Sequence, residues 1–129
     1  MILGTGIDII EVARIRAAHE KFGERFLKRV LRPDEIAYCF SHNNPAPFLA
    51  ARFAAKEAIS KAFGTGIGRR LGWQDMEVAH KESGEPFVIL HDGGRKLFEQ
   101  RGGTGIHLTL SHTETYAAAA AILERQRPT

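Results

Sequence analysis

Cysteine is nearly absent from this sequence, because Cys39 is the only one among 129 residues. A single cysteine cannot form a disulfide within the chain, and it excludes a zinc site built from several cysteines. No run of apolar residues reaches the roughly 18 that a membrane-spanning helix needs. The opening MILGTGIDII lacks the length and basic charge of a signal peptide. We therefore expect a cytoplasmic protein that makes no membrane contact, with Cys39 as a buried structural thiol.

Internal repeats, low-complexity tracts and linkers are absent as well. Hydrophobic residues make up 43% of the chain and charged residues 26%, which is typical of a folded globular protein. A chain of 129 residues is long enough for one domain with its own core and short for two. We expect a single domain that spans residues 1–129.

The spacing of apolar residues predicts an α+β fold, in which helices pack on one face of an antiparallel sheet. Residues 116–123, YAAAAAIL, are ambiguous, because alanine favours helix but the segment follows a strand and a short polar turn. We assign it to a strand. The other expected strands cover residues 2–12, 73–81, 86–90 and 106–113, and the expected helices cover 12–31 (with a candidate break at Gly23), 33–40, 48–63 and 93–103.

Positive charge is concentrated in one segment. Residues 14–32 contain seven bases and two acids, a net charge of +5, whereas the whole chain carries +3. A local basic surface attracts anionic partners, which include nucleic acid, acidic proteins and phosphate-rich ligands.

Three charged residues stand out against their apolar surroundings. Asp8 lies between Ile7 and Ile9, where a bare buried carboxylate is costly, so it either caps a strand end or has a partner or a bound cation. Glu57 and Lys61 are four residues apart in the helix expected over 48–63, so they share one side. They form either an exposed ion pair or part of a binding site.

Two further motifs suggest contacts with phosphate. In GTGIGRR (64–70) the glycines would let backbone N–H groups approach a phosphate, although the motif follows a helix and is more typical of a helix end. In LSHT (110–113), Ser111 and His112 point to opposite faces of a strand, which excludes a Ser–His dyad and leaves His112 as a phosphate or base contact. With Asp8 and Glu57 as ligands for Mg²⁺, and with Lys61, Arg52 and His112 near phosphates, the residues favour phosphoryl chemistry on a polyphosphate ligand.

Three blocks in the sequence resemble the holo-[acyl-carrier-protein] synthases, the small bacterial 4′-phosphopantetheinyl transferases. These blocks are GIDIIEVARI, RFAAKEAISKAFGTGIG and LTLSHTETYAAAA. The resemblance implies the 4′-phosphopantetheinyl transferase-like fold and a homotrimer with active sites at subunit interfaces. It also implies transfer of 4′-phosphopantetheine from coenzyme A to a serine of apo acyl carrier protein, a step that serves fatty acid biosynthesis.

The same resemblance implies a role for individual residues. Asp8 and Glu57 would bind Mg²⁺, and Glu57 and Lys61 would act in catalysis. The coenzyme A site would be formed by Arg52, Lys61, Gly64, Thr65, Gly66 and His112.

The basic segment gains a candidate role in docking the acidic carrier protein, through Arg14, Lys21, Arg25, Phe26 and Arg29. Charge complementarity of this kind raises association rates more than affinity. Two alternatives remain open. One is a nucleic-acid-binding module, which leaves Asp8 and Glu57 without a role, and the other is a different Mg²⁺-dependent enzyme such as a nucleotide hydrolase.

Overall fold

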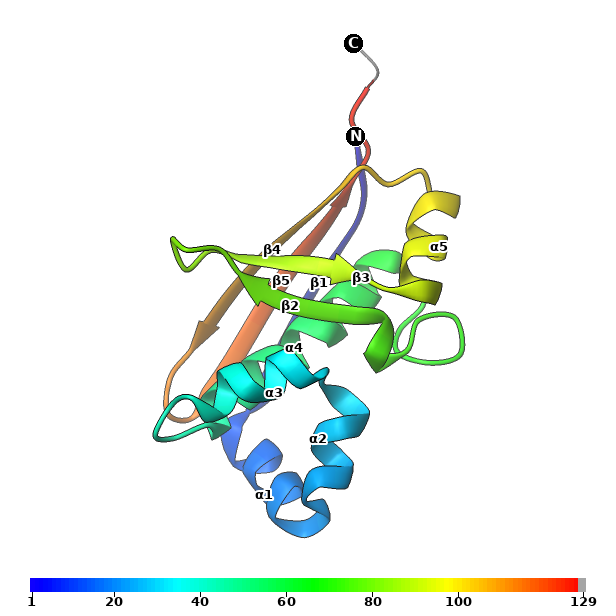
Figure 1. Cartoon of the computed structure of the whole chain (residues 1–129). Coiled ribbons are helices and arrows are strands. Elements are labelled where there is room, and N and C mark those ends of the chain that lie inside the picture. The colour runs from blue at the N-terminus through cyan, green and yellow to red at the C-terminus, as the bar shows by residue number, and fades with distance from the viewer. Residues whose placement is uncertain (128–129) are drawn as a thin grey trace.

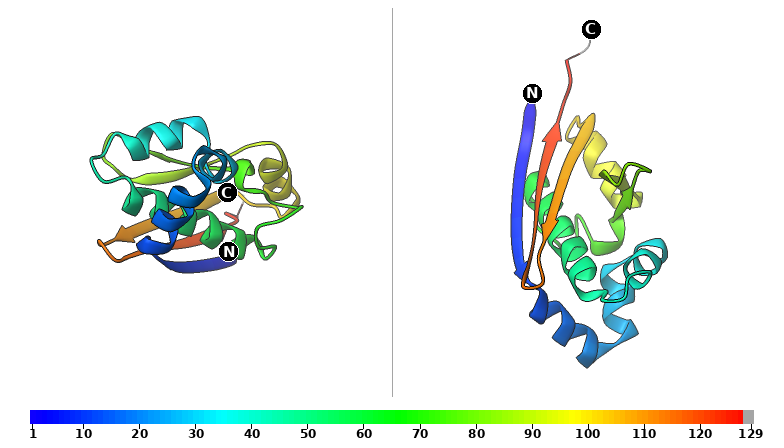
Figure 2. Two further views of the ribbon diagram at one scale, coloured as in Figure 1. Left: turned by 90° about the horizontal axis from the view of Figure 1, so that it is seen from below. Right: turned by 90° about the vertical axis from the view of Figure 1, so that its left-hand side faces the viewer.

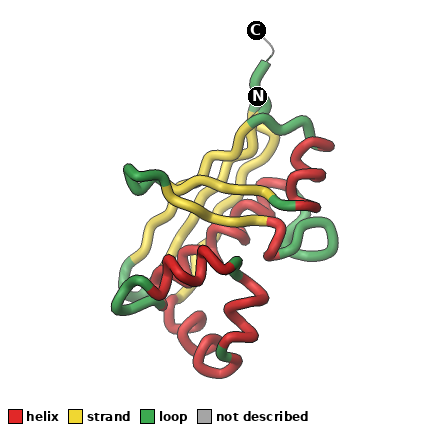
Figure 3. The backbone as a smooth tube through the Cα atoms, viewed as in Figure 1, coloured by secondary structure: helices red, strands yellow, loops and turns green. Residues whose placement is uncertain are grey.

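Helices fill most of the first half of the chain after one opening strand, and strands dominate the second half (Figures 1 and 3). The computed structural model describes residues 1–127, so residues 128–129 of the expected domain lie outside it. The helices are α1 (Val12–Phe22), α2 (Glu24–Val30), α3 (Pro33–Phe40), α4 (Ala46–Phe63) and α5 (Asp92–Gln100). The strands are β1 (Ile2–Glu11), β2 (Met76–His80), β3 (Pro86–Leu90), β4 (Gly105–His112) and β5 (Tyr116–Glu124).

The main sheet has three antiparallel strands in the order β1–β5–β4. The alanine-rich residues 116–123 are therefore a strand, as predicted, and they form the centre of the sheet. Small side chains suit this place, because Ala117, Ala119 and Ala121 are buried beneath the long helix α4. Asp8 pairs with Ala119 across the β1–β5 ladder, so it lies within the strand and not at its end.

Only one face of the main sheet is covered. The right-hand view of Figure 2 shows the helices and the β2–β3 hairpin on the same side of the three strands. On the other face Ile7 and Ile9 are 70% and 67% exposed, and Ile122 and Tyr116 of β5 are exposed beside them. The predicted arrangement of helices on one face of an antiparallel sheet is thus confirmed.

Strand β1 and helix α4 touch at their backbones. A Cβ atom at Gly4 would lie 1.9 Å from the carbonyl oxygen of Ala62, and one at Gly6 would lie 1.9 Å from that of Ala58. Any side chain at either position would push the two elements apart. Because residues alternate along a strand, Asp8 follows Gly4 and Gly6 on the face that meets α4.

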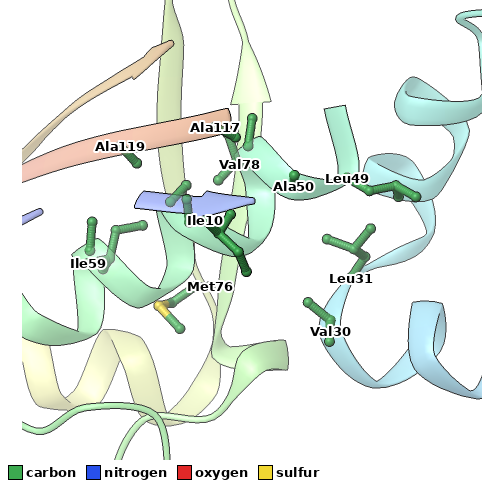
Figure 4. Packing of buried hydrophobic residues seen from close by; sticks show 14 of the residues in the cluster. Ile10, Val30, Leu31, Leu49, Ala50, Ile59, Met76, Val78, Ala117 and Ala119 are labelled. Carbon is green, nitrogen blue, oxygen red and sulfur yellow. The ribbon is translucent and has the colours of Figure 1, made fainter. Parts of the chain in front are cut away.

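The hairpin expected from residues 73–81 and 86–90 forms, but it is a separate two-stranded sheet. It pairs β2 with β3 from Met76 to His80, and a short 3₁₀ turn replaces the start of the expected strand at Trp73–Asp75. The hydrophobic core lies between the two sheets and around α4, where Ile10, Ile59, Met76, Val78 and Ala119 gather (Figure 4).

Local chain signals account for the helix boundaries. Gly23 has φ +61° and divides the expected helix 12–31 into α1 and α2, as the sequence suggested. Helix α4 begins two residues before the expected start, with Pro47 in its first turn, where its missing N–H costs no hydrogen bond. Within residues 1–127 no helix is both long and apolar enough to cross a membrane.

A fully buried ion pair joins α3 to α4. Lys56 Nζ lies 2.7 Å from Glu35 Oε1 and also donates to the carbonyl oxygens of Val30 and Trp73. Glu35 accepts further bonds from the backbone N–H groups of Arg32 and Val78. The pair is therefore satisfied on all sides, as a buried charge pair must be.

Candidate active site

The carboxylates of Asp8 and Glu57 line one pocket of about 390 Å³ between β1, α1, α2 and α4. Asp8 reaches it from the face of β1 that meets α4, and Glu57 reaches it from α4 itself. The glycine–alanine contact between these elements fixes how close the two groups lie. The sequence placed both residues in one site, and the structure brings them together.

Lys61 completes this group of charges. Its Nζ lies 3.3 Å from Asp8 Oδ1 and donates to the carbonyl oxygen of Ile7 at 2.9 Å. Lys61 is therefore one partner of Asp8, and a cation bound by Asp8 stays a prediction. Lys61 remains half exposed, so its ammonium is accessible to a ligand at this edge of β1.

The electrostatic environment raises the pKa of Glu57. Partial burial is the largest cause, and the nearby charge of Asp8 acts in the same direction, while Lys61 opposes both. A carboxylate with a raised pKa accepts a proton more readily at neutral pH than an ordinary glutamate.

The donor set suits Mg²⁺ and not a metal held by protein groups alone. Among residues 1–127 no group of three or more His, Cys, Asp or Glu side chains is arranged to hold a metal ion. Mg²⁺ typically takes only one or two protein carboxylates and fills its other positions with water and substrate phosphate oxygens. Asp8 and Glu57 would provide those two carboxylates, because both line the same pocket.

Part of the expected docking surface borders the same pocket. Arg14 of α1 and Phe26 of α2 are among the lining residues. The other expected docking residues, Lys21, Arg25 and Arg29, are exposed on these two helices. A macromolecule bound to the basic helices would therefore lie next to the carboxylates.

Arg52 and His112 lie elsewhere, in a second pocket of about 210 Å³. Arg52 precedes Glu57 by five residues, which turns it about 140° away around the helix. The structure thus brings Arg52 and His112 together, but it does not place them beside Asp8 and Glu57 in the same chain.

Arg52 is 2% exposed and surrounded by rings. Its guanidinium lies 4.1 Å from the centre of the Tyr38 ring, and its Nη2 donates to His80 Nδ1 at 3.2 Å. Sequence reasoning missed Tyr38 and His80, because neither lies in a motif and only the fold brings α3 and β2 to Arg52. Lys56 of the same helix is also buried, but its partners differ from those of Arg52.

The glycine turn at residues 64–66 ends α4. Gly64 has φ +79°, and the backbone N–H groups of Gly64, Thr65 and Gly66 all donate to carbonyl oxygens of the last helical turn. These donors are therefore engaged, and a phosphate cannot be held by them in this conformation. Contact between the turn and a ligand stays a prediction that rests on the open space around Gly66.

Comparison with known proteins decides the family. The model of the 4′-phosphopantetheinyl transferase superfamily matches residues 4–121. The chain belongs to this superfamily. Within it, the chain is 49% identical to a holo-[acyl-carrier-protein] synthase of Koribacter versatilis, over 96% of this chain and 99% of the relative. The family and the class of enzyme predicted from the three sequence blocks are confirmed.

Solved structures of the family share the fold. The holo-[acyl-carrier-protein] synthase of Neisseria meningitidis superposes with a TM-score of 0.91 at 34% identity, covering 97% of this chain and 100% of that one. The Helicobacter pylori enzyme, solved in complex with coenzyme A, superposes with a TM-score of 0.84 at 30% identity, covering 93% and 99%. The 4′-phosphopantetheinyl transferase-like fold is thus confirmed.

Proposed function

We propose that the chain transfers 4′-phosphopantetheine from coenzyme A to a serine hydroxyl of an acyl carrier protein. The other product is adenosine 3′,5′-bisphosphate, and the reaction takes place in the cytoplasm as part of fatty acid biosynthesis. The observation that carries the proposal is the pocket in which Asp8 and Glu57 meet Arg14 and Phe26. It combines a site for phosphate chemistry with a basic docking surface in a chain of this superfamily.

Asp8 and Glu57 of the first pocket, with Lys61 beside Asp8, have separate roles. Asp8 and Glu57 would hold Mg²⁺, which would supply positive charge to neutralise the pyrophosphate of coenzyme A. Lys61 binds a phosphate oxygen and stabilises the charge that develops on the leaving group. Glu57 takes the proton of the carrier serine, directly or through a water molecule. The serine oxygen attacks the β-phosphorus in line with the bond that breaks.

The second pocket receives another phosphate of coenzyme A, through Arg52 and His112. Arg52 lies on a different side of α4 from Glu57, and His112 of β4 lies beside Arg52. One chain therefore offers two separate parts of a coenzyme A site, which we call half-sites. We propose a homotrimer in which the open sheet face with Ile7 and Ile9 packs between subunits, so that one coenzyme A spans both halves. Burying these exposed isoleucines would also provide the apolar contact that stable oligomers need.

Arg14, Lys21, Arg25 and Arg29 attract the acidic carrier protein, and Phe26 offers an apolar contact at the mouth of the pocket. Such a surface accelerates encounter and orients the carrier serine toward Glu57.

Incubation of the chain with coenzyme A, Mg²⁺ and an apo acyl carrier protein tests the function by intact mass. We expect the carrier to gain one phosphopantetheine group, and we expect Asp8→Asn and Glu57→Gln to abolish most of this gain. No gain of mass with any carrier would overturn the proposal. Near-normal transfer by both variants would leave the activity but remove the metal site. Hydrolysis of the coenzyme without transfer would favour the nucleotide hydrolase instead.

A further inference from the structure

Arg52 is a buried cation that has no anion beside it. Among residues 1–127 no carboxylate lies within 4.0 Å of its guanidinium, and its Nε has no hydrogen-bond partner. An unpaired buried charge is costly, and one left so in a folded protein indicates a site completed by a ligand. The pocket in front of Arg52 is therefore built for an anion.

The chemistry of coenzyme A limits which anion this can be. On the proposed function, its pyrophosphate binds at Asp8 and Glu57 of the other pocket and at Lys61 beside Asp8. The one remaining anionic group is the phosphate monoester on the ribose. A monoester has a second pKa of about 6, so it carries nearly two negative charges at neutral pH. Such a dianion calls for more than one cation.

His80 is placed to become the second cation. An arginine can only donate, so the bond from Arg52 Nη2 requires His80 Nδ1 to accept, which means that this imidazole is neutral. The His80 ring also stacks on Tyr38, with ring centres 4.6 Å apart and planes at 12°, and this fixes its orientation. Burial, the Arg52 guanidinium and His42 all lower the pKa of His80 below its ordinary value.

The other charged and titratable groups at this pocket come from three elements. Tyr38 lies on α3, and His42 lies in the loop after α3, where it stacks on Phe48. His112 of β4 contacts the same Phe48 ring in a T-shaped arrangement. Carboxylates are absent from the residues that line the pocket. No carboxylate in the lining neutralises Arg52, so a dianion that enters supplies the negative charge that favours protonation of His80.

Resting on the proposed function, we propose that His80 is a specificity-determining residue that takes up a proton when the phosphate monoester of coenzyme A binds to Arg52. The proton comes from solvent and adds to Nδ1, so the hydrogen bond between His80 and Arg52 breaks. Both side chains then donate to the phosphate oxygens. A ligand without the monoester supplies no charge to hold this proton.

The consequence is a coupling between pH and the choice of ligand. The complex binds more protons than the free protein, so coenzyme A binds more tightly as the pH falls toward the pKa of free His80. Dephospho-coenzyme A, which lacks only the monoester, should bind with little pH dependence. Discrimination between the two ligands therefore increases as the pH falls from 8 to 7, above the second pKa of the monoester itself.

Isothermal titration calorimetry of the full chain measures this uptake directly. The binding enthalpy at pH 7.5 is compared in Tris and MOPS buffers, whose ionisation enthalpies differ, for coenzyme A and for dephospho-coenzyme A. A nearby opposite charge raises a histidine pKa, so we expect measurable proton uptake for coenzyme A and close to none for the control ligand. Equal uptake with both ligands would overturn the proposal.

His80→Gln keeps an oxygen that accepts from Arg52 but cannot titrate. We expect it to abolish the uptake and to weaken coenzyme A binding at pH 6 about tenfold, with dephospho-coenzyme A unaffected. His19→Gln, on α1 and outside the pocket, is the matched control and should retain full uptake. Uptake that persists in His80→Gln but disappears in His42→Gln or His112→Gln would assign the proton elsewhere and reject the role of His80. The mass assay separates the two ideas, because intact transfer without proton uptake rejects only this inference.

Discussion

A Cβ atom at Gly6 would lie 1.9 Å from the carbonyl oxygen of Ala58, so the strand that carries Asp8 and the helix that carries Glu57 are joined backbone to backbone. Since the obstacle is main chain and not a flexible side chain, Gly6→Ala must separate β1 from α4. Overpacking of this kind costs about 3 kcal/mol in the free energy of unfolding. We also expect transfer activity to fall, because Asp8 moves with the strand.

Chemical denaturation followed by circular dichroism checks this prediction. Gly68→Ala is the matched control, because Gly68 has open space around its Cβ position and needs no positive φ. It should change stability by no more than about 0.5 kcal/mol. Equal stability of the two variants would contradict the contact.

The buried pair of Lys56 and Glu35 predicts a large asymmetry between two lysines. Lys56→Met leaves Glu35 as an uncompensated buried charge, which should cost about 3–5 kcal/mol of stability. Lys28→Met breaks a pair with Glu24 that is mostly in solvent, and it should cost less than about 0.5 kcal/mol. Urea denaturation of both variants measures the difference, and similar losses would argue against burial of the Lys56 pair.

Much of the fold could be predicted from the sequence, because its signals are local. Gly23 and Pro33 mark helix ends by backbone geometry alone, and the alternation in residues 106–113 specifies a strand. The alanines of residues 116–123 gave the weakest signal, since propensity favoured helix, and the preceding strand and turn decided correctly. Pairing of the hairpin into its own sheet was not predictable, because sequence does not reveal which edges meet.

The site was predictable where its geometry follows from spacing within one element. Glu57 and Lys61 share a side of α4 because they are four residues apart. The burial of Arg52 and Lys56 was not predicted, because alanines are spread along α4 and no apolar stripe marks its buried side. Their partners Tyr38, His80 and Glu35 come from other elements, which only the tertiary structure brings near.

The raised pKa of Glu57 gives a prediction about stability and pH. A carboxyl group whose pKa is raised on folding contributes stability below its unfolded pKa and loses it as the pH rises through the folded value. Without Mg²⁺, Glu57→Gln should therefore be more stable than the native chain near pH 7.5, by up to about 1 kcal/mol, since the site is partly solvated. Near pH 4 the two should be equal.

Thermal unfolding at both pH values measures this effect, with Glu99→Gln on the exposed side of α5 as a control that should behave like the native chain. Adding Mg²⁺ and coenzyme A should reverse the order, because ligands stabilise the form that binds them. If Glu57→Gln were less stable at neutral pH without ligands, the repulsion between Glu57 and Asp8 would be refuted.

Charge reversal on the basic helices should weaken carrier docking. Arg14→Glu and Arg25→Glu are each expected to raise the KM for carrier protein about tenfold at low salt. The effect of Arg25→Glu should shrink at high ionic strength, where exposed charges are screened. Steady-state kinetics measure both, and Lys96→Glu on α5 is the control. An unchanged KM would show that the carrier docks elsewhere.

The open sheet face should control the oligomeric state. Ile7→Glu places like charges together wherever copies of this face meet, which costs several kcal/mol per contact. We expect sedimentation velocity to show a trimer for the native chain and a monomer for the variant, with coenzyme A binding reduced tenfold or more, because the two half-sites separate. Phe22→Glu, an exposed residue away from this face, should leave the trimer intact. A native chain that sediments as a monomer would reject the shared site.

The bond between Glu35 and Lys56 also constrains how this sequence can change over evolutionary time. Either residue replaced alone strands a charge in the core, while the two replaced together by apolar residues leave none behind. A single substitution at either position is therefore strongly destabilising, whereas a double substitution is tolerated. Descendants of this chain should therefore keep or lose Glu35 and Lys56 together. Because Lys56 immediately precedes Glu57, the residue next to Glu57 in α4 is constrained by a residue twenty-one places away in the sequence.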